Sequence, residues 1–148
     1  MRRLSVLLAS LLLAVPMVGV QAGDAGLAIN KPWIREAPPR AKALAGYMAL
    51  KNHSDKERVL LSASSPDYFD VIMLHRTVIE GEIARMVFQP MIKIPARGEV
   101  IFEPNDYHLM LIRPLKRIRA GDRVNITLRF KDGETRDVEY KVVSPFDN

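Results

Sequence analysis

Residues 124–142 read VNITLRFKDGETRDVEYKV, and this stretch decides the fold class of the chain. Apolar and polar residues alternate on both sides of Asp132-Gly133, a dipeptide typical of a two-residue hairpin turn. Alternation with a period of two is the pattern of a strand with one buried face. The stretch therefore predicts an antiparallel β-hairpin whose buried positions are Val124, Ile126, Leu128, Phe130, Val138, Tyr140 and Val142.

The chain between residue 23 and this hairpin has the same character, with short apolar runs separated by turn residues. No part of it shows the 3.6-residue apolar period of a long amphipathic helix. The further strands that we expect cover residues 29–35, 44–52, 58–64, 71–79, 83–89, 99–102 and 108–113. Short strands at this spacing predict a single all-β domain, a Greek-key sandwich or barrel.

The first 22 residues differ from the rest and are typical of a secretory signal. Met1-Arg2-Arg3 is a short basic region, residues 4–20 are almost wholly apolar, and Val20-Gln21-Ala22 places small residues where signal peptidase reads them. We expect cleavage after Ala22, export of the protein, and a mature domain of residues 23–148 with no stable membrane span. A single membrane anchor is the alternative, but the apolar stretch is short for a span.

Composition excludes several classes of site. The chain has no cysteine, which rules out disulfides, zinc–thiolate sites, iron–sulfur clusters, blue-copper centres, cysteine nucleophiles and lipid attachment through cysteine. The formal net charge of +5 falls to +3 when Arg2 and Arg3 leave with the signal. An exported protein of such modest charge is not expected to bind nucleic acid.

Three histidines are candidates for chemistry, and they differ in setting. His53 lies in a polar turn, where we expect it to be solvated. His75 and His108 lie inside predicted strands. Because side chains alternate along a strand, His75 shares a face with Met73, and His108 shares a face with Met110. These two strands are therefore the places where a metal site could form.

A hairpin links the first of these strands to a further methionine. If Glu80-Gly81 forms a two-residue turn, His75 lies directly opposite Met86, with Cβ atoms about 4.5–5.5 Å apart. An imidazole and a thioether at that spacing can reach one ion. A second strand that brings His108 and Met110 to the same face would complete a set of two histidines and two methionines.

The ligand types narrow the chemistry. Thioether sulfur is soft and uncharged, so it suits Cu(I) far better than Zn²⁺, Mg²⁺ or Ca²⁺. The set contains no evident general base or nucleophile, which favours binding and transfer of a metal over catalysis, and we expect that the protein is not an enzyme. The alternative is structural, because methionine is a common core filler and a strand histidine can be a half-buried residue with its hydrogen bonds made. Geometry alone leaves both interpretations open.

At these residues the sequence resembles the periplasmic copper chaperone family of the PCu(A)C type. The family pattern is His (or Met), ten residues, Met, twenty-one residues, then His-x-Met. Here ten residues separate His75 from Met86, and twenty-one separate Met86 from His108-Leu109-Met110. Further similar features lie along nearly all of residues 23–148, among them Pro32-Trp33-Ile34-Arg35, Pro38-Pro39, Ala45-Gly46-Tyr47-Met48, Ile94-Pro95-Ala96 and Leu128-Arg129-Phe130.

The resemblance implies a cupredoxin-like β-barrel with one Cu(I) per chain, bound by His75, Met86, His108 and Met110. It also implies a periplasmic chaperone that delivers copper to the dinuclear centre of cytochrome c oxidase. The acceptor would be oxidase subunit II or a thiol-bearing assembly factor. We expect the protein itself to be a monomer.

The chain departs from the family pattern around the site. An acidic residue is common two positions before the first histidine, whereas this chain has Met73, an auxiliary ligand or, more simply, a packing residue. Glycines are common just before His-x-Met, whereas this chain has the loop 104–107, Pro-Asn-Asp-Tyr. Trp33 either flanks the site or, as we favour, covers one end of the core.

Two other functions remain open. A copper-storage or resistance protein would use the same site, and a β-sandwich interaction module would need no metal. A basic cluster after the His-x-Met strand is either a solvated loop or a docking surface for an acidic partner; it consists of Arg113, Lys116, Arg117, Arg119 and Arg123.

Overall fold

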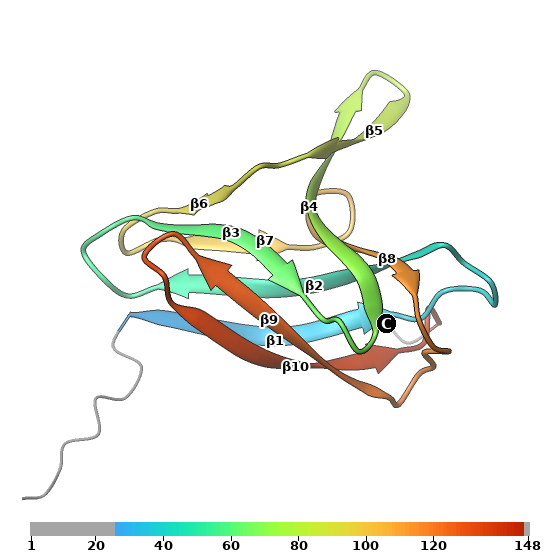
Figure 1. Cartoon of the computed structure of the whole chain (residues 1–148). Coiled ribbons are helices and arrows are strands. Elements are labelled where there is room, and N and C mark those ends of the chain that lie inside the picture. The colour runs from blue at the N-terminus through green and yellow to red at the C-terminus, as the bar shows by residue number, and fades with distance from the viewer. Residues whose placement is uncertain (1–25, 147–148) are drawn as a thin grey trace, which may run out of the picture.

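The computed structural model describes residues 26–146, which form strands, turns and connecting loops and no helix. The predicted signal peptide, residues 1–22, lies outside the described residues. Ten strands follow one another along the chain (Figure 1). They are β1 (Leu27–Arg35), β2 (Ala43–Asn52), β3 (Arg58–Ser64), β4 (Phe69–Glu80), β5 (Ile83–Phe88), β6 (Ile92–Ile94), β7 (Glu99–Phe102), β8 (Tyr107–Pro114), β9 (Arg123–Phe130) and β10 (Thr135–Val143).

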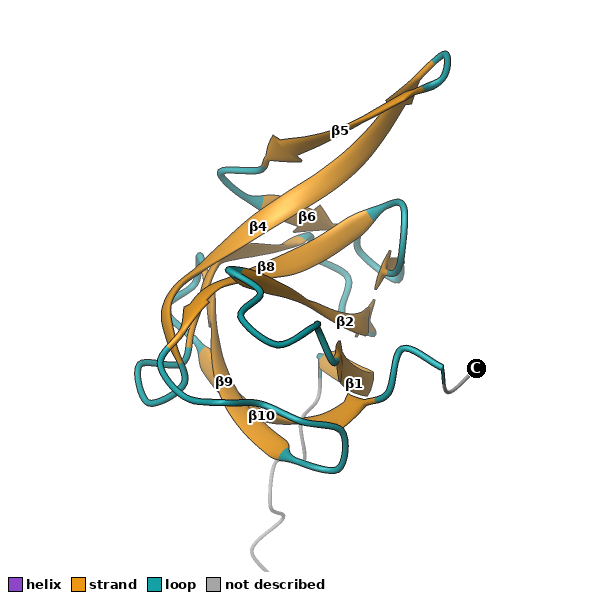
Figure 2. Cartoon of the chain, turned by 90° about the vertical axis from the view of Figure 1, so that its right-hand side faces the viewer, coloured by secondary structure: helices purple, strands orange, loops and turns teal. Residues whose placement is uncertain are grey.

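All ten strands belong to one sheet that curls into a barrel (Figures 1 and 2). Their order is β5-β4-β8-β7-β2-β1-β10-β9-β3-β6, and the pairing of Ala63 in β3 with Ile72 in β4 closes the ring. β5 pairs only with β4, so the β4–β5 hairpin rises above the barrel. The all-β prediction is confirmed. Within residues 26–146 no helix is long and apolar enough to cross a membrane.

The last hairpin supplies one wall of the core. All seven positions that the alternation predicted to be buried lie in the core cluster. Tyr140 is fully buried, and its hydroxyl donates to the sulfur of Met48 at 2.8 Å. Burial away from water raises the pKa of this phenol. Met48 is 2 % exposed and belongs to the core cluster.

The turn of this hairpin is longer than predicted. The Phe130 N–H donates to Glu134 O at 2.9 Å, and the Gly133 N–H donates to Phe130 O at 3.0 Å. The loop is therefore three residues, 131–133, with Gly133 in the left-handed region at φ 90°. Glycine is the residue that favours this conformation at the end of a three-residue loop. The prediction of a two-residue Asp132-Gly133 turn was therefore wrong by one residue.

β7 and β8 are two parts of one course along β2. β7 pairs with β2 as far as Phe102 and Met48, and β8 resumes the pairing at Leu109 and Gly46. Only Tyr47 lies between these two pairs in β2, whereas six residues, 103–108, lie between them on the other side. This excursion turns towards β4, and the Thr77 N–H donates to Asp106 O at 3.1 Å.

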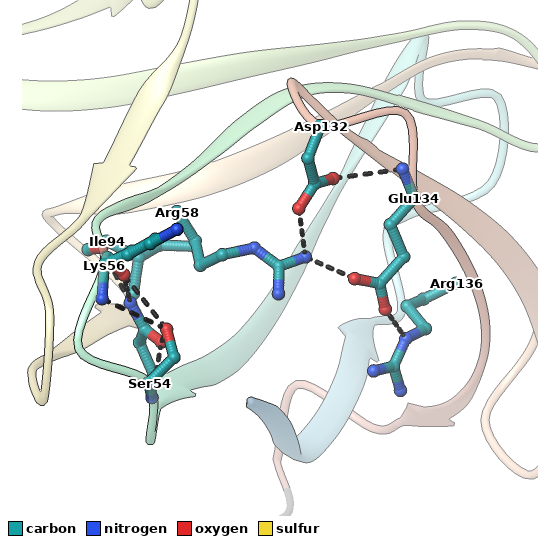
Figure 3. Close-up of polar contacts among 8 residues, drawn as sticks. Ser54, Lys56, Arg58, Ile94, Asp132, Glu134 and Arg136 are labelled. Carbon is teal, nitrogen blue, oxygen red and sulfur yellow. Dashed lines mark hydrogen bonds and ion pairs between the residues drawn. The ribbon is translucent and has the colours of Figure 1, made fainter. Parts of the chain in front are cut away.

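A polar network joins the start of β3 to the last hairpin, at the left-hand end of the barrel in Figure 1. Arg58 forms ion pairs with Asp132 at 3.0 Å and with Glu134, which also bonds to Arg136 (Figure 3). The Arg58 guanidinium lies 5.3 Å from the centre of the Phe130 ring.

Asn52 organises the neighbouring loop from a buried position. Its amide nitrogen donates to the carbonyl oxygens of Lys56 at 2.7 Å, Pro95 at 3.0 Å and Ile94 at 3.3 Å. Its oxygen accepts from both the N–H and the hydroxyl of Ser54. Both polar groups of this side chain are thus used.

Candidate metal site

β4 and β8 place four of the sulfur- and imidazole-bearing residues in two direct cross-strand pairs. His75 pairs with His108, and Met73 pairs with Met110. Paired residues point to the same side of a sheet, so all four share a face. The two imidazole centroids are 5.8 Å apart, with the rings at 73°. The sequence prediction that His75 and His108 lie on neighbouring strands had only the family resemblance behind it, and the register now supplies the geometry.

Met86 lies two residues away from its predicted place. The hairpin turns at Gly81-Glu82, with Gly81 at φ 63°, so Thr77 rather than His75 pairs with Met86. The prediction of a Glu80-Gly81 turn was wrong, because Gly81 takes the first turn position instead of the second. The error is an even number of residues, so Met86 still lies on the face of His75, as a diagonal neighbour.

His108 is the most buried candidate ligand, with 5 % of its surface exposed. Its Nδ1 lies 3.0 Å from Asp106 O, a carbonyl that can only accept, so Nδ1 carries the proton. Its Nε2 is buried and has no hydrogen-bond partner. A neutral imidazole held in this tautomer presents a lone pair at Nε2, which is the state that a metal requires.

His75 also has an unpartnered ring nitrogen, in this case the buried Nδ1. The ring stands edge-on to Phe88, with centroids 6.2 Å apart at 88°. Burial, and to a lesser extent the charge of His108, lower the pKa of His75 below its usual 6.5. Two neighbouring imidazoles therefore each have a buried nitrogen without a hydrogen-bond partner.

The methionines of the site differ in exposure. Met110 is half-buried, Met73 is 36 % exposed, and Met86 is 64 % exposed on a strand whose residues are all exposed. Thioethers at a protein surface are soft donors that need no desolvation of charge to bind a soft ion. Solvent exposure on this face therefore increases from the buried His108 to the exposed Met86. Met91, outside the family pattern, is an exposed residue of the following loop.

The excursion 103–108 orients His108. Asp106 O accepts both from His108 and from the Thr77 backbone. The Asp106 carboxylate accepts from Arg76 Nε at 2.8 Å, and the Arg76 guanidinium lies 4.8 Å from the centre of the Tyr107 ring. Sequence reasoning treated Asp106 only as a turn residue. Its position two residues before a candidate ligand was the available signal.

The residue before Asp106 has a left-handed backbone conformation. Asn105 has φ 70°, in the left-handed region that asparagine tolerates better than most residues. Phe88 was also missed, because its place opposite His75 follows only from the correct turn.

Trp33 belongs to neither the core nor the covered end that we favoured. It is half-buried, pairs with Tyr47 in β2, and stacks on it with ring centroids 4.4 Å apart. Arg35 lies over both rings, at 5.7 and 5.9 Å. A bulge between Asn30 and Trp33 turns the indole to the outer face, so our core interpretation was wrong. In the described part of the chain no group of three or more His, Asp or Glu residues offers another metal site.

Comparison with known proteins identifies the family. The LpqE-like family, described as "Putative lipoprotein LpqE-like", matches residues 27–142. The chain belongs to this family, which is of the PCuAC type. Among the curated members and relatives, this LpqE-like chain is 28% identical over 118 residues to "Putative lipoprotein Lxx21020" of Leifsonia xyli subsp. xyli (strain CTCB07), covering 79% of this chain and 69% of that protein.

Solved structures place the LpqE-like barrel among PCuAC domains. The Cu(I) form of DR1885 from Deinococcus radiodurans is 32% identical, with a TM-score of 0.67, over 88% of this chain and 85% of that one. The copper-bound PCuAC domain of PmoF2 has a TM-score of 0.69 at 22% identity, over 81% and 94% of the two chains. The cupredoxin-like fold and the family resemblance inferred from the sequence are confirmed.

Proposed function

We propose that this LpqE-like protein binds one Cu(I) through His75, Met86, His108 and Met110 and hands it to an acceptor protein. The observation that carries the proposal is the pair of buried nitrogens, His75 Nδ1 and His108 Nε2, neither of which has a hydrogen-bond partner. A buried polar atom without a partner costs free energy, and a bound ion would recover it. The Cu(I)-bound state of the relative DR1885 supports copper as that ion.

The four donors suit an ion that has to leave again. All are uncharged, so binding neither creates nor neutralises a buried anion, and Cu(I) is the first-row ion that thioethers favour. Met86 is the most exposed of them and lies on an outer strand. An acceptor thiolate or imidazole can therefore displace this sulfur first, and His108, fixed by Asp106, last. Copper moves by ligand exchange, and no bond of a substrate is made or broken.

The proposed place of action is the periplasm, with the dinuclear copper centre of cytochrome c oxidase as destination. The lipoprotein descriptions of the family and of the Leifsonia relative support an exported protein. Residues 1–22 have the sequence of a cleavable signal. Subunit II of the oxidase, or a thiol-bearing assembly factor, is the proposed acceptor.

Anaerobic titration of the protein with Cu(I) against a chromogenic chelator tests the site. We expect one Cu(I) per chain, with affinity at least about tenfold weaker in Met86→Leu and Met110→Leu, because each variant removes a donor and keeps the apolar volume. Met91→Leu is the matched control, since Met91 is also exposed but lies outside the site. Absence of stoichiometric binding, or equal affinities in all four proteins, would contradict the proposal.

A second measurement separates delivery from storage. The Cu(I)-loaded protein is mixed with the apo copper-binding domain of oxidase subunit II, and copper arrival is followed over time. A chaperone loads the acceptor faster than it releases copper to a dilute chelator, because the ligands exchange within a complex. A storage protein transfers no faster than that release.

A further inference from the structure

A cavity of about 710 Å³ is lined by residues of two segments, 36–44 and 113–118. The loop that follows β1 and the loop that follows β8 form its walls. The two loops are joined where the Arg113 N–H donates to Lys42 O at 2.8 Å. A hollow of this volume is of the size that small ligands or a few side chains of a partner fill.

The rim of this cavity is strongly basic. Five cations line it against one carboxylate, that of Glu36; they are Arg40, Lys42, Arg113, Lys116 and Arg117. Arg113 is neutralised by Asp70, to which its Nε donates at 2.7 Å. Lys116 lies over the Tyr68 ring, with Nζ 3.7 Å from its centre.

The other three cations have no such compensation. Among the described residues, Arg40, Lys42 and Arg117 make no ion pair, and all three side chains are exposed. The structure also divides the basic cluster seen in the sequence. Arg123 pairs with Glu139 and, like Arg119, does not line the cavity. Positive charge is thus concentrated on the hollow rather than spread along the loop.

The floor of the cavity is apolar. Leu44 and Ile118 are buried at its base, and Pro38, Pro39 and Pro114 stiffen its walls. An occupant must therefore combine acidic groups for the rim with an aliphatic side chain for the floor. A flat anionic membrane would meet the cations but leave the hollow unfilled. An acidic polypeptide segment with an apolar residue fits both.

The cavity and the candidate copper site share β8. Arg113 follows Met110 by three residues, about 10 Å along a strand. We propose that this cavity holds an acidic, partly apolar segment of the copper acceptor and so places the acceptor's ligands beside the site. This inference rests on the proposed function and adds to it the docking surface and the chemistry that recognises the partner.

Titration of the isotope-labelled protein with a capped peptide, Asp-Leu-Glu-Asp-Leu-Glu, tests the cavity by NMR. We expect shifts confined to residues 36–44 and 113–118, weakening as salt is raised because the rim charges are exposed. The analogue Asn-Leu-Gln-Asn-Leu-Gln keeps the shape but lacks the charge, and should not bind. Combining Lys42→Glu with Arg117→Glu should weaken peptide binding roughly tenfold.

Arg119→Glu is the matched control for Arg117→Glu alone, because it makes the same change two residues away but outside the cavity. Equal weakening by these two single variants would show that only net charge matters and would overturn the proposal. So would peptide shifts elsewhere on the barrel, or binding to phosphatidylglycerol vesicles through these residues in place of the peptide.

Copper measurements keep the two proposals distinguishable. The double variant should retain full Cu(I) affinity but load the subunit II domain more slowly. If the wild-type protein binds no Cu(I), the proposed function fails whatever the peptide does. If copper binds and transfers at an unchanged rate in the double variant, the docking inference alone fails.

Discussion

Asn52 and His108 are both buried polar side chains in this barrel, and they are treated in opposite ways. Asn52 uses its amide nitrogen on three carbonyls and its oxygen on two donors of Ser54. His108 uses one nitrogen on Asp106 and has the other buried with no partner. His75 beside it also has a buried nitrogen without a partner. The fold thus satisfies every polar group of the Asn52 side chain, whereas it orients His108 and leaves one of its ring nitrogens without a partner.

One further unpartnered atom defines the limit of this comparison. Arg58 Nε is also buried without a hydrogen bond, yet its guanidinium is already held by Asp132 and Glu134. That atom is an N–H donor on a cation and cannot bind a metal ion. An unpartnered atom therefore indicates a metal site only where it carries a lone pair and has soft donors beside it.

We expect the largest effect on stability when Asn52, whose polar groups are all hydrogen-bonded, is replaced. Asn52→Ala leaves buried carbonyls without donors and should lower the free energy of unfolding by about 2–4 kcal/mol in urea titration. Asn125→Ala, on an exposed strand position, is the control and should change it little. The folded fraction of each variant should bind Cu(I) with the affinity of the wild-type protein. Weaker Cu(I) binding in Asn52→Ala alone would show that the Asn52 network and the candidate metal site are not independent.

The next largest effect is expected on Cu(I) affinity, when a histidine with an unpartnered nitrogen is replaced. His75→Leu removes a buried nitrogen that makes no hydrogen bond, so the unfolding free energy of the copper-free protein should stay within about 1 kcal/mol. Cu(I) affinity should fall by more than the roughly 10–100-fold that loss of an outer-shell partner costs. Urea unfolding and chelator competition on one sample measure both. His53→Gln, in an exposed loop, is the control.

The smallest expected effect sharpens the comparison through pH. Burial and His108 lower the pKa of His75 in the folded protein. The unfolded chain therefore binds more protons than the folded one as pH falls through about 6.5, and the copper-free protein should lose stability there. Above that pH the effect is absent. His75→Leu should flatten the dependence measured between pH 7.5 and 5; an unchanged slope would assign it to another group.

Much of the fold was readable from alternation alone. The buried set of the last hairpin was right at every position because period-two patterning survives errors in turn length. The turn itself was wrong by one residue, since Asp132-Gly133 suits both two- and three-residue loops. β6, only three residues long, was not predicted, because a strand that short has too little pattern to detect.

The candidate ligand set followed from the family resemblance, but the resemblance did not give the geometry of the set. The two-residue shift of Met86 arose because Gly81 can stand at either position of a turn. The contacts of Asp106 with His108 and Arg76 were missed because they depend on the excursion between β7 and β8. No local sequence pattern predicts that excursion. Sequence patterns predict which face of a sheet a side chain lies on far better than they predict which residue it pairs with on the neighbouring strand.

That excursion also makes the pairing of β2 independent of the segment that orients His108. The barrel keeps its register with β2 on both sides of residues 103–108, at Phe102 and at Leu109. Asp106, which contacts His108, Thr77 and Arg76, therefore lies in a segment that does not pair with β2. A substitution within residues 103–106 can change how His108 is held while the pairing of β2 stays as it is.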